Sequence, residues 1–401
     1  MSSAQSVRQL IHAHPHWGAV QAIYHRLVAN GYCAFLAGGC VRDALLGLVA
    51  HDLDIATDAT PDQIESLFEK TVNVGKSFGV MRVIVDGADI EVATFRTDGD
   101  YKDGRRPDSV VFSSPEEDAK RRDFTINALF FDLQSEQVLD FVDGQIDLEQ
   151  KIIKTVGQAR FRFQEDQLRL LRAARFAAQL SFAVEEQTLL AMTEMASAVK
   201  NVSGERIRDE MGKLLKSKNV SLGLEVMNQS GLMKVLFPWR QGKTDWSAMG
   251  AQELWQNLSL FFREASPPDL AKGLGLLRLS AKDRKAIEES WELWQQPEAF
   301  FTKRTGSKLQ LLLKSGVDWA LQVLLQEKKF VPEIEAVRKQ KAAWGDSLPK
   351  AFLSGDDVKG LLQGEAIGRC LQEVYWLQLE RQLGSREEAL LWLKKHLEKG
   401  S

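Results

Sequence analysis

The sequence predicts an α+β protein in which a small mixed head precedes a long all-helical extension. Up to about residue 150, alternating β-branched runs that end in turn residues stand between helical patterns. From Phe161 onward Leu, Ala, Gln, Glu and Lys recur at helical spacing, and no strand is predicted. A length of 401 residues is enough for about two to four packed units.

The head contains two predicted hairpins and two predicted helix starts. Met81–Phe95 holds two alternating runs joined at Asp86-Gly87, a favourable two-residue turn, and Leu129–Val142 has the same form. Thr60–Gln63 combines a capping box with proline at the first helical position, and Ser114–Glu117 repeats this pattern.

Composition excludes several classes of protein. The net charge is −3, so any nucleic-acid surface must come from local Lys/Arg clusters. Three scattered cysteines, Cys33, Cys40 and Cys370, argue against a disulfide framework. No apolar run is long enough to span a bilayer, and the first residues lack the apolar stretch of a secretory signal. We therefore expect a cytoplasmic protein without a membrane partner.

The N-terminal histidines do not predict a metal site. His12, His14 and His16 cluster around Pro15, but they lack nearby cysteine or carboxylate partners. We expect them to lie in a solvated terminal segment.

Asp52-Leu53-Asp54 is the first candidate site. If His51–Ala56 is a strand, Asp52 and Asp54 share one face and Leu53 faces the core. Neighbouring carboxylates repel unless a cation lies between them, and Mg²⁺ accepts one or two protein carboxylates plus water and phosphate oxygens. Taken alone, such a pair is more often a solvated strand end than a metal site.

Gly38-Gly39 is a candidate phosphate-binding turn before a predicted helix. Glycines let a backbone approach phosphates closely, the helix N-terminus offers N–H groups, and Arg42 could add a charge-assisted contact. The alternative is a glycine turn capping a core helix, with Arg42 paired to Asp43.

Two more charged residues leave alternatives open. Glu91 lies in the second strand of the first hairpin, either on its solvent side or as a third acid beside Asp52 and Asp54. Arg122 is either part of a charged helix terminus or a contact for a triphosphate or ribose.

Asp166, Arg169, Arg172 and Arg175 follow one another at three-residue steps on a predicted helix. As a pattern alone, a salt-bridged amphipathic helix explains this stripe.

Together these motifs resemble the class II tRNA nucleotidyltransferases, a family of CCA-adding enzymes to which bacterial poly(A) polymerases are close relatives. The matching stretches cover roughly residues 20–240 in the family's order, with the last a weaker extension: "LAGGCVRDALLG", "HDLDIATDATPDQI", "IEVATFRTDGDYKDGRRPDSVVF", "EEDAKRRDFTINALFFD", "FVDGQIDL", "RFQEDQLRLLRAARFAAQLSF" and "GERIRDEMGKLL".

The resemblance implies a fold and a domain order. The head would be of the polymerase-beta-like nucleotidyltransferase type with a small mixed sheet, at residues 1–150. An all-helical neck for nucleotide selection (151–215), body (216–305) and tRNA-binding tail (306–401) would follow. The resemblance also implies tRNA, ATP and CTP as partners and Mg²⁺ as cofactor, with no stable protein partner.

The resemblance also assigns roles to residues. Asp52 and Asp54 would hold two Mg²⁺ ions, of which one activates the RNA 3′-hydroxyl and the other binds the triphosphate. Glu91 would be the third acid. Gly38, Gly39 and Arg42 would hold the triphosphate, and Arg122 would contact the nucleotide. Arg172 and Arg175 would support the pair of Asp166 and Arg169 and contact phosphate.

Asp166 and Arg169 would select the base. Cytosine and adenine each present an amino donor that a carboxylate accepts, and Arg169 would donate to the adjacent ring acceptor. Uracil and guanine would set a carbonyl oxygen against the carboxylate, and unpaired buried polar groups can discriminate by ~10⁴.

Full CCA addition is the first expectation for the product. The stretch from Arg96 to Phe112 looks like an undeleted flexible loop, which relatives restricted to C addition tend to lack. Addition of A alone and poly(A) synthesis are the alternatives, and a non-catalytic RNA-binding protein on the same fold is an alternative of another class. The basic stretches Lys216–Ser221 and Arg338–Trp344 are candidate RNA contacts or solvated faces.

Overall fold

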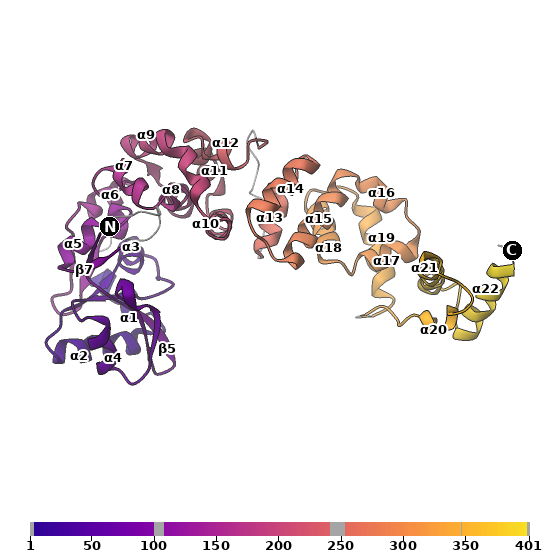
Figure 1. The fold of residues 1–401 in the computed structure, drawn as a ribbon, viewed down its shortest axis with the longest axis horizontal. Helices are drawn as coiled ribbons and strands as arrows, with labels where there is room; N and C mark the ends of the chain where they lie inside the picture. The colour runs from indigo at the N-terminus through magenta and orange to yellow at the C-terminus, as the bar shows by residue number, and fades with distance from the viewer. Residues whose placement is uncertain (1–3, 100–107, 241–252, 346, 399–401) are drawn as a thin grey trace. The chain divides into compact units, whose positions relative to one another are not determined.

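The computed structural model describes residues 4–99, 108–240, 253–345 and 347–398. The chain divides into two compact units, Met1–Thr244 and Asp245–Ser401, each described here by itself. The α+β class is confirmed, with a mixed sheet near the N-terminus, two further two-stranded ladders and many helices (Figure 1). The four-part division at residues 150, 215 and 305 stays a prediction.

A mixed sheet forms the centre of the head. Within the described residues it has seven strands, in the order β3 (Thr71–Gly75), β4 (Val80–Val85), β5 (Ala88–Thr94), β2 (Ile55–Thr57), β1 (Ala34–Ala37), β8 (Phe130–Asp132) and β9 (Gln137–Leu139). Only β2 and β5 pair in parallel among these neighbours. Both predicted hairpins are confirmed, as β4–β5 and β8–β9.

Short helices surround this sheet: α1 (Ala4–His12), α2 (Trp17–Ala29), α3 (Gly39–Leu45), α4 (Pro61–Leu67), α5 (Pro115–Lys120) and α6 (Gly144–Gln150). Both predicted starts are present, because Thr60 forms a full capping box on α4 and the Ser114 side chain accepts from the Glu117 N–H on α5. On one side of the sheet, Phe35, Phe95 and Phe130 meet ring to ring in an apolar cluster. This packing fixes the strand ends that carry the candidate site.

The prediction of a solvated N-terminal segment holds for His12 and His16, which are exposed, and is wrong for His14. Val7 and Ile11 are fully buried where α1 packs against α3, and the His14 side chain is only 6% exposed. The apolar face of α1 explains the difference, because its burial carries the following residues into the head.

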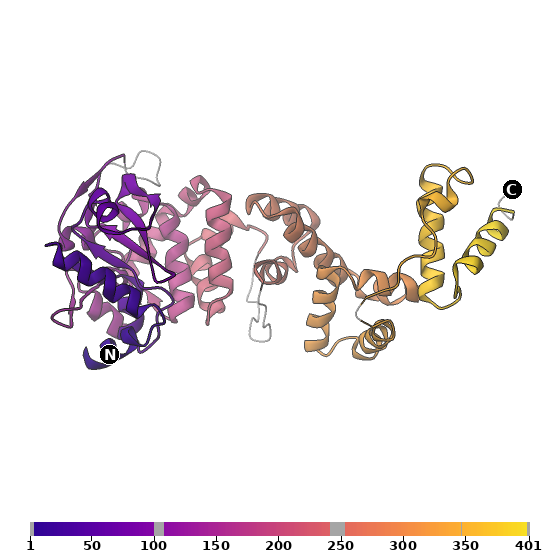
Figure 2. The ribbon, with the colours of Figure 1, turned by 90° about the horizontal axis from the view of Figure 1, so that it is seen from below.

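The rest of the N-terminal unit is helical: α7 (Ala159–Glu165), α8 (Leu168–Leu180), α9 (Glu186–Met195), α10 (Gly204–Leu215), α11 (Val220–Gln229) and α12 (Leu232–Leu236). Figure 2 shows these magenta helices side by side. Helix α8 is central, since it packs against both α10 and α11. The prediction of no strand beyond Phe161 is wrong at one point: β11 (Ala183–Val184) pairs with β10 (Ile152–Ile153).

The C-terminal unit contains α13 (Leu254–Phe262), α14 (Pro267–Leu276), α15 (Ala281–Gln295), α16 (Pro297–Phe301), α17 (Thr305–Leu311), α18 (Ser315–Gln326), α19 (Val331–Ala342), α20 (Gly355–Val358), α21 (Glu365–Leu379) and α22 (Arg386–Glu398). One apolar core gathers around Trp319 and Leu324, and another around Val358 and Val374. Among the described residues, no helix combines the length and apolar character needed to span a membrane.

The contact between α8 and α11 allows a first prediction. A Cβ on Gly223 would lie 2.7 Å from the Ala178 Cβ and 2.9 Å from the Ala174 carbonyl oxygen. Gly223→Ala should therefore lower the free energy of unfolding in urea by about 1–3 kcal/mol through overpacking. Gly18→Ala in α2 should leave the free energy of unfolding unchanged or raise it, because a Cβ there would meet no atom within 4 Å. Equal effects at both sites would contradict this account of the packing.

Candidate active site

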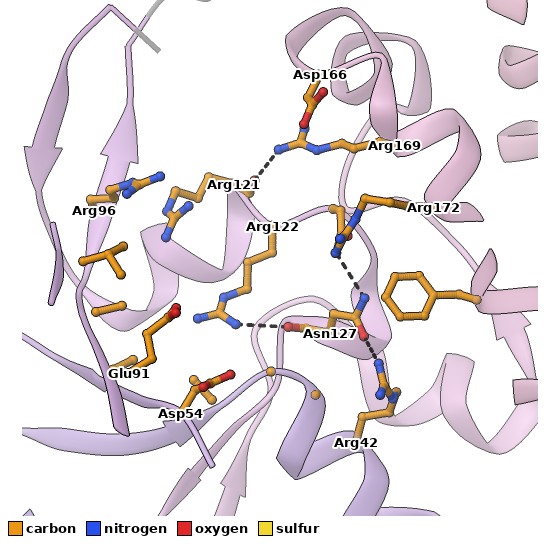
Figure 3. Close-up of a pocket in the computed structure, with 18 of the residues that line it drawn as sticks. Arg42, Asp54, Glu91, Arg96, Arg121, Arg122, Asn127, Asp166, Arg169 and Arg172 are labelled. Carbon is orange, nitrogen blue, oxygen red and sulfur yellow. Dashed lines mark hydrogen bonds and ion pairs between the residues drawn. The ribbon is translucent and has the colours of Figure 1, made fainter. Parts of the chain in front are cut away.

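A cavity of about 580 Å³ lies in the N-terminal unit between the sheet and the start of α8. Its charged lining consists of seven arginines (Arg42, Arg96, Arg121, Arg122, Arg169, Arg172 and Arg206) and four acids (Asp54, Glu91, Asp123 and Asp166). Figure 3 shows Asp54 and Glu91 at one side and Asp166 and Arg169 at the other, with Arg121 and Arg122 between. The cavity thus has an acidic end, an arginine-rich middle and a carboxylate–arginine pair.

Most of the predicted site residues meet in this cavity, although they come from distant parts of the chain. Those that line it are Gly38, Gly39, Arg42, Asp54, Glu91, Arg122, Asp166, Arg169 and Arg172. Asp52 and Arg175 do not line it. The structure therefore brings the motifs together, while the roles assigned to their residues stay predictions.

The acidic pair lies just before a strand rather than within one. Strand β2 starts at Ile55, and residues 51–54 before it belong to no strand. Alternation still holds, since Leu53 is buried while Asp52 and Asp54 point away from the core. Asp52 is 77% exposed on its side chain and pairs with His51 at 3.0 Å.

The environment of Asp54 and Glu91 favours a bound cation. Burial, then the charges of Glu91 and Asp52, raises the pKa of Asp54 to about 6. Burial also raises the pKa of Glu91. A divalent cation would offset both the desolvation and the mutual repulsion of these carboxylates.

The described residues contain no group of three or more His, Cys, Asp or Glu side chains arranged to hold a metal ion. Mg²⁺ needs only one or two protein carboxylates, because water and phosphate oxygens complete its shell. The carboxylates at this end of the cavity therefore fit a magnesium ion that binds together with a triphosphate.

At Gly38 the backbone lies close to the Arg122 side chain, and the nearby Arg42 carries a buried charge. Gly38 has φ +75°, and a Cβ there would lie 3.0 Å from Nη1 of Arg122. Arg42 is 5% exposed, donates to Oδ1 of Asn127 at 2.6 Å and pairs with Asp43. Arg42 thus forms the expected pair with Asp43 and also lines the cavity, while its contact with a phosphate stays a prediction.

The Arg122 guanidinium donates two hydrogen bonds to the Asp118 carboxylate, with N–O distances of 2.9 and 3.1 Å. Arg122 also donates to the Asn127 carbonyl oxygen. Its guanidinium also lies 4.8 Å from the centre of the Phe130 ring. The charge of Arg122 lowers the pKa of Asp54 and Glu91 against the larger effect of burial, so it lies close to the acids.

Asp166 and Arg169 do not share one uninterrupted helix. Helix α7 ends at Glu165, Asp166 is extended with φ −144°, and α8 begins at Leu168. Asp166 accepts from the Leu168 N–H at 3.0 Å and pairs with Arg206 at 2.7 Å. Its short side chain caps the start of α8, which is why the helix breaks here.

Arg169 is 9% exposed and held on two sides. It pairs with Glu165 at 2.5 Å and donates to the backbone oxygens of Arg162 and Arg121. Within the described residues these bonds use three of the five N–H donors of the guanidinium. The remaining donors can serve a ligand.

A buried ion network lies behind this pair. Arg172 binds Asp123 at 2.5 Å and lies 3.9 Å from Glu210, which pairs with Arg175 at 2.6 Å. Arg175 is thus turned toward Glu210 and stacks at 3.9 Å over Phe176. This pairing is why Arg175 does not reach the cavity.

Several lining residues were not predicted: Arg96, Arg121, Asp123, Asn127, Phe176 and Arg206. Asn127 is a polar residue within an otherwise apolar run, and this pattern is a sequence signal for a functional side chain. No local pattern links Arg206 to Asp166, because 40 residues separate them.

Comparisons with known proteins address the family. A model described as the poly A polymerase head domain matches residues 34–154, and one described as a probable RNA and SrmB-binding site of polymerase A matches residues 181–240. The CCA-adding enzyme of Lactiplantibacillus plantarum is 35% identical over 402 residues, covering 93% of this chain and 94% of that protein. The chain belongs to the CCA-adding enzyme family. The resemblance seen in the sequence is confirmed.

Two further members of the CCA-adding enzyme family agree. The CCA-adding enzyme of Bacillus pumilus is 48% identical over 215 residues, which are 53% of this chain and 54% of that protein. The crystal structure of Bacillus stearothermophilus CCA-adding enzyme in complex with CTP has a TM-score of 0.78 at 28% identity, covering 97% of this chain and 100% of that one. The chain is thus a tRNA nucleotidyltransferase, and its family implies dependence on a divalent metal.

The ion network predicts a defined pH dependence of stability. Burial alone would raise the pKa of Asp123, but Arg172 and Arg169 lower it from 3.8 to about 2. The folded state therefore binds the proton more weakly than the unfolded state, so this stabilisation is present above about pH 4 and is lost as the pH falls toward 2. Asp123→Asn should remove about 2 kcal/mol of this pH-dependent stability in urea denaturation.

The exposed residue Asp89, which pairs with Arg82 on the surface, provides the matched control. Asp89→Asn should leave the pH dependence near that of the parent chain. If Asp123→Asn keeps the parent's loss of stability between pH 4 and pH 2, then Asp123 does not carry it.

Proposed function

We propose that this chain adds CCA to the 3′ end of tRNA without a nucleic-acid template, transferring CMP from CTP and AMP from ATP with release of pyrophosphate. The observation that supports this most is the single cavity that holds Asp54 and Glu91 at one end and Asp166 with Arg169 at the other. Family membership and the CTP complex of a structurally similar CCA-adding enzyme support the same function.

Asp52 and Asp54, with Glu91 beside them, are the proposed ligands for Mg²⁺. Bound there, the metal would activate the RNA 3′-hydroxyl and stabilise the charge on the departing pyrophosphate. The backbone of Asp54 is held beside β1, because its carbonyl oxygen accepts from the Ala37 N–H at 3.0 Å. Asp52 is exposed and can turn from His51 toward a metal.

Arg42 and Arg122 are proposed to hold the triphosphate, and the backbone at Gly38 and Gly39 lets phosphate oxygens come close. Asp118 and Asn127 hold both guanidinium groups in place before the substrate arrives. Such preorganisation spares reordering of the side chains at the moment of reaction.

Asp166 and Arg169 are proposed to read the base. The bonds of Asp166 to Leu168 and Arg206 leave acceptor capacity on its carboxylate for the amino group of cytosine or adenine. Arg169 donates to the neighbouring ring nitrogen of either base. Both side chains are held by the protein, so they act as a fixed template.

The RNA surface and the location of the protein are further parts of the proposal. We place tRNA contacts in the helical tail (306–401) and at the two basic stretches. The affinity should be modest because the net charge is −3, and it should fall as salt rises because Lys/Arg contacts to phosphates release counterions. The free cysteines Cys33, Cys40 and Cys370 support a cytoplasmic location.

One assay separates the possible products. Purified protein is given three tRNA substrates, lacking the last three, the last one or none of the CCA nucleotides, each with CTP and ATP. The CCA proposal expects C and then A on the first and A on the second. An enzyme for A alone extends only the second, a poly(A) polymerase extends the third, and a non-catalytic RNA-binding protein extends none.

The flexible loop from Arg96 to Phe112 is the sequence feature that favours A addition. Residues 100–107 of this loop lie outside the described residues.

The acidic end gives a direct test of catalysis. Asp54→Ala removes a metal-binding carboxylate and should lower CMP and AMP incorporation at least about 10³-fold, because charge stabilisation at the reacting phosphate is lost. Asp62→Ala removes an acid from α4 that is 85% exposed and should leave incorporation unchanged. Incorporation that survives Asp54→Ala would refute the proposed site.

The base-reading pair is tested separately. Asp166→Ala should let UTP and GTP compete with CTP and ATP, with a loss of discrimination of about tenfold or more, while the Mg²⁺ dependence stays the same. Asp209→Ala, on the exposed face of α10, is the matched control. Discrimination among the four nucleotides that is unchanged in Asp166→Ala would remove the templating role.

A further inference from the structure

His14 is a buried histidine outside the cavity, and its ring makes two hydrogen bonds. The side chain is 6% exposed. Nδ1 accepts from the His16 N–H at 3.1 Å, and Nε2 lies 3.2 Å from the carbonyl oxygen of His51. An acceptor at Nδ1 places the ring hydrogen on Nε2, so His14 donates to His51.

This second bond reaches the segment that carries the candidate metal ligands. His51 directly precedes Asp52, and at the other end the Asp54 backbone oxygen accepts from the Ala37 N–H at 3.0 Å. Between these two attachments only the Leu53 side chain is buried, at 2% exposure. Residues 51–54 lie outside any ladder, so the bond from His14 fixes the end that a strand would otherwise fix.

The N-terminal segment that carries His14 is itself packed against the head. Val7 and Ile11 bury the apolar face of α1 against α3, near the sheet (Figure 1). Arg8 pairs with Glu136, in the turn between β8 and β9, at 2.7 Å. The N-terminal segment is therefore attached to the head at several points besides the bond between His14 and His51.

We propose that His14 is a positioning residue that holds residues 51–54 so that Asp52 and Asp54 can bind a divalent cation together. This inference rests on the proposed function, in which these two acids are metal ligands. The segment before α2 thus takes part in the catalytic site without touching the substrate.

A purely local role is the competing account, since His14 also caps the turn before α2 through His16. Two substitutions separate the roles, because each preserves one of the two bonds. In His14→Asn the amide oxygen can still accept from the N–H two residues on, as in an Asx turn, but the side chain is too short to reach His51. In His14→Gln the longer amide can still donate to the His51 oxygen.

The test measures Mn²⁺ binding to the full chain by electron paramagnetic resonance, together with turnover of tRNA and CTP. His14→Ala and His14→Asn should weaken Mn²⁺ binding about tenfold, the size expected from one lost hydrogen bond. Turnover should fall at least as much, while the KM for tRNA stays unchanged. His14→Gln should stay within about threefold of the parent chain, and so should the matched control His16→Ala, whose side chain is exposed.

Asp54→Ala is the reference that separates the two proposals. If Asp54→Ala loses Mn²⁺ binding while His14→Ala and His14→Asn retain it, His14 does not position the acids. If Mn²⁺ binding and turnover are normal in His14→Asn but reduced in His14→Gln, His14 acts only in the local turn and the inference is overturned. If Asp54→Ala binds Mn²⁺ normally, the proposed metal site itself fails, and this inference fails with it. Should His14→Ala not fold, the Asn and Gln variants decide.

Discussion

The ion pair between Asp123 and Arg172 is the contact on which the candidate site depends. Asp123 follows α5 in the head and is buried, whereas Arg172 projects from α8 and is partly buried. A buried charge left without its partner costs several kcal/mol, so the two elements cannot shift past each other cheaply. The acids near the sheet and the carboxylate–arginine pair at the start of α8 therefore keep a fixed separation.

A dense group of arginines is compatible with a folded, weakly acidic chain because each is backed by an acid. Asp118 is 1% exposed and contacts Arg121 at 2.6 Å and Arg122 at 2.9 Å. Burial would raise the pKa of Asp118, but these arginines outweigh burial and lower it. The acids thus neutralise the arginines from the protein side, and the guanidinium faces toward the cavity are available to phosphate.

The sequence could predict what depends on local pattern and not what depends on distant contacts. The hairpin at Asp86-Gly87 follows from turn chemistry and alternation, and the motifs containing Asp54 and Glu91 are identifiable in the sequence, although their proximity is not. The partner of Asp166 was not predictable, because Arg206 reaches it only through the packing of α10 on α8. The burial of His14 was missed for a similar reason: a histidine-rich terminus has a solvated composition, and only the docking of α1 encloses it.

Selection of a base by two side chains requires that those side chains do not adapt. A carboxylate free to rotate would accept from any amino group and could turn away from a carbonyl oxygen. Arg206 and the Leu168 N–H occupy opposite oxygens of Asp166, and Glu165 holds Arg169, so rotation of either group would break existing bonds. In the proposed mechanism, discrimination against uracil and guanine would then arise from the cost of breaking these bonds or of facing oxygen with oxygen. In that proposal α10 presents no group to the base, yet it would influence selectivity through the bond of Arg206 to Asp166.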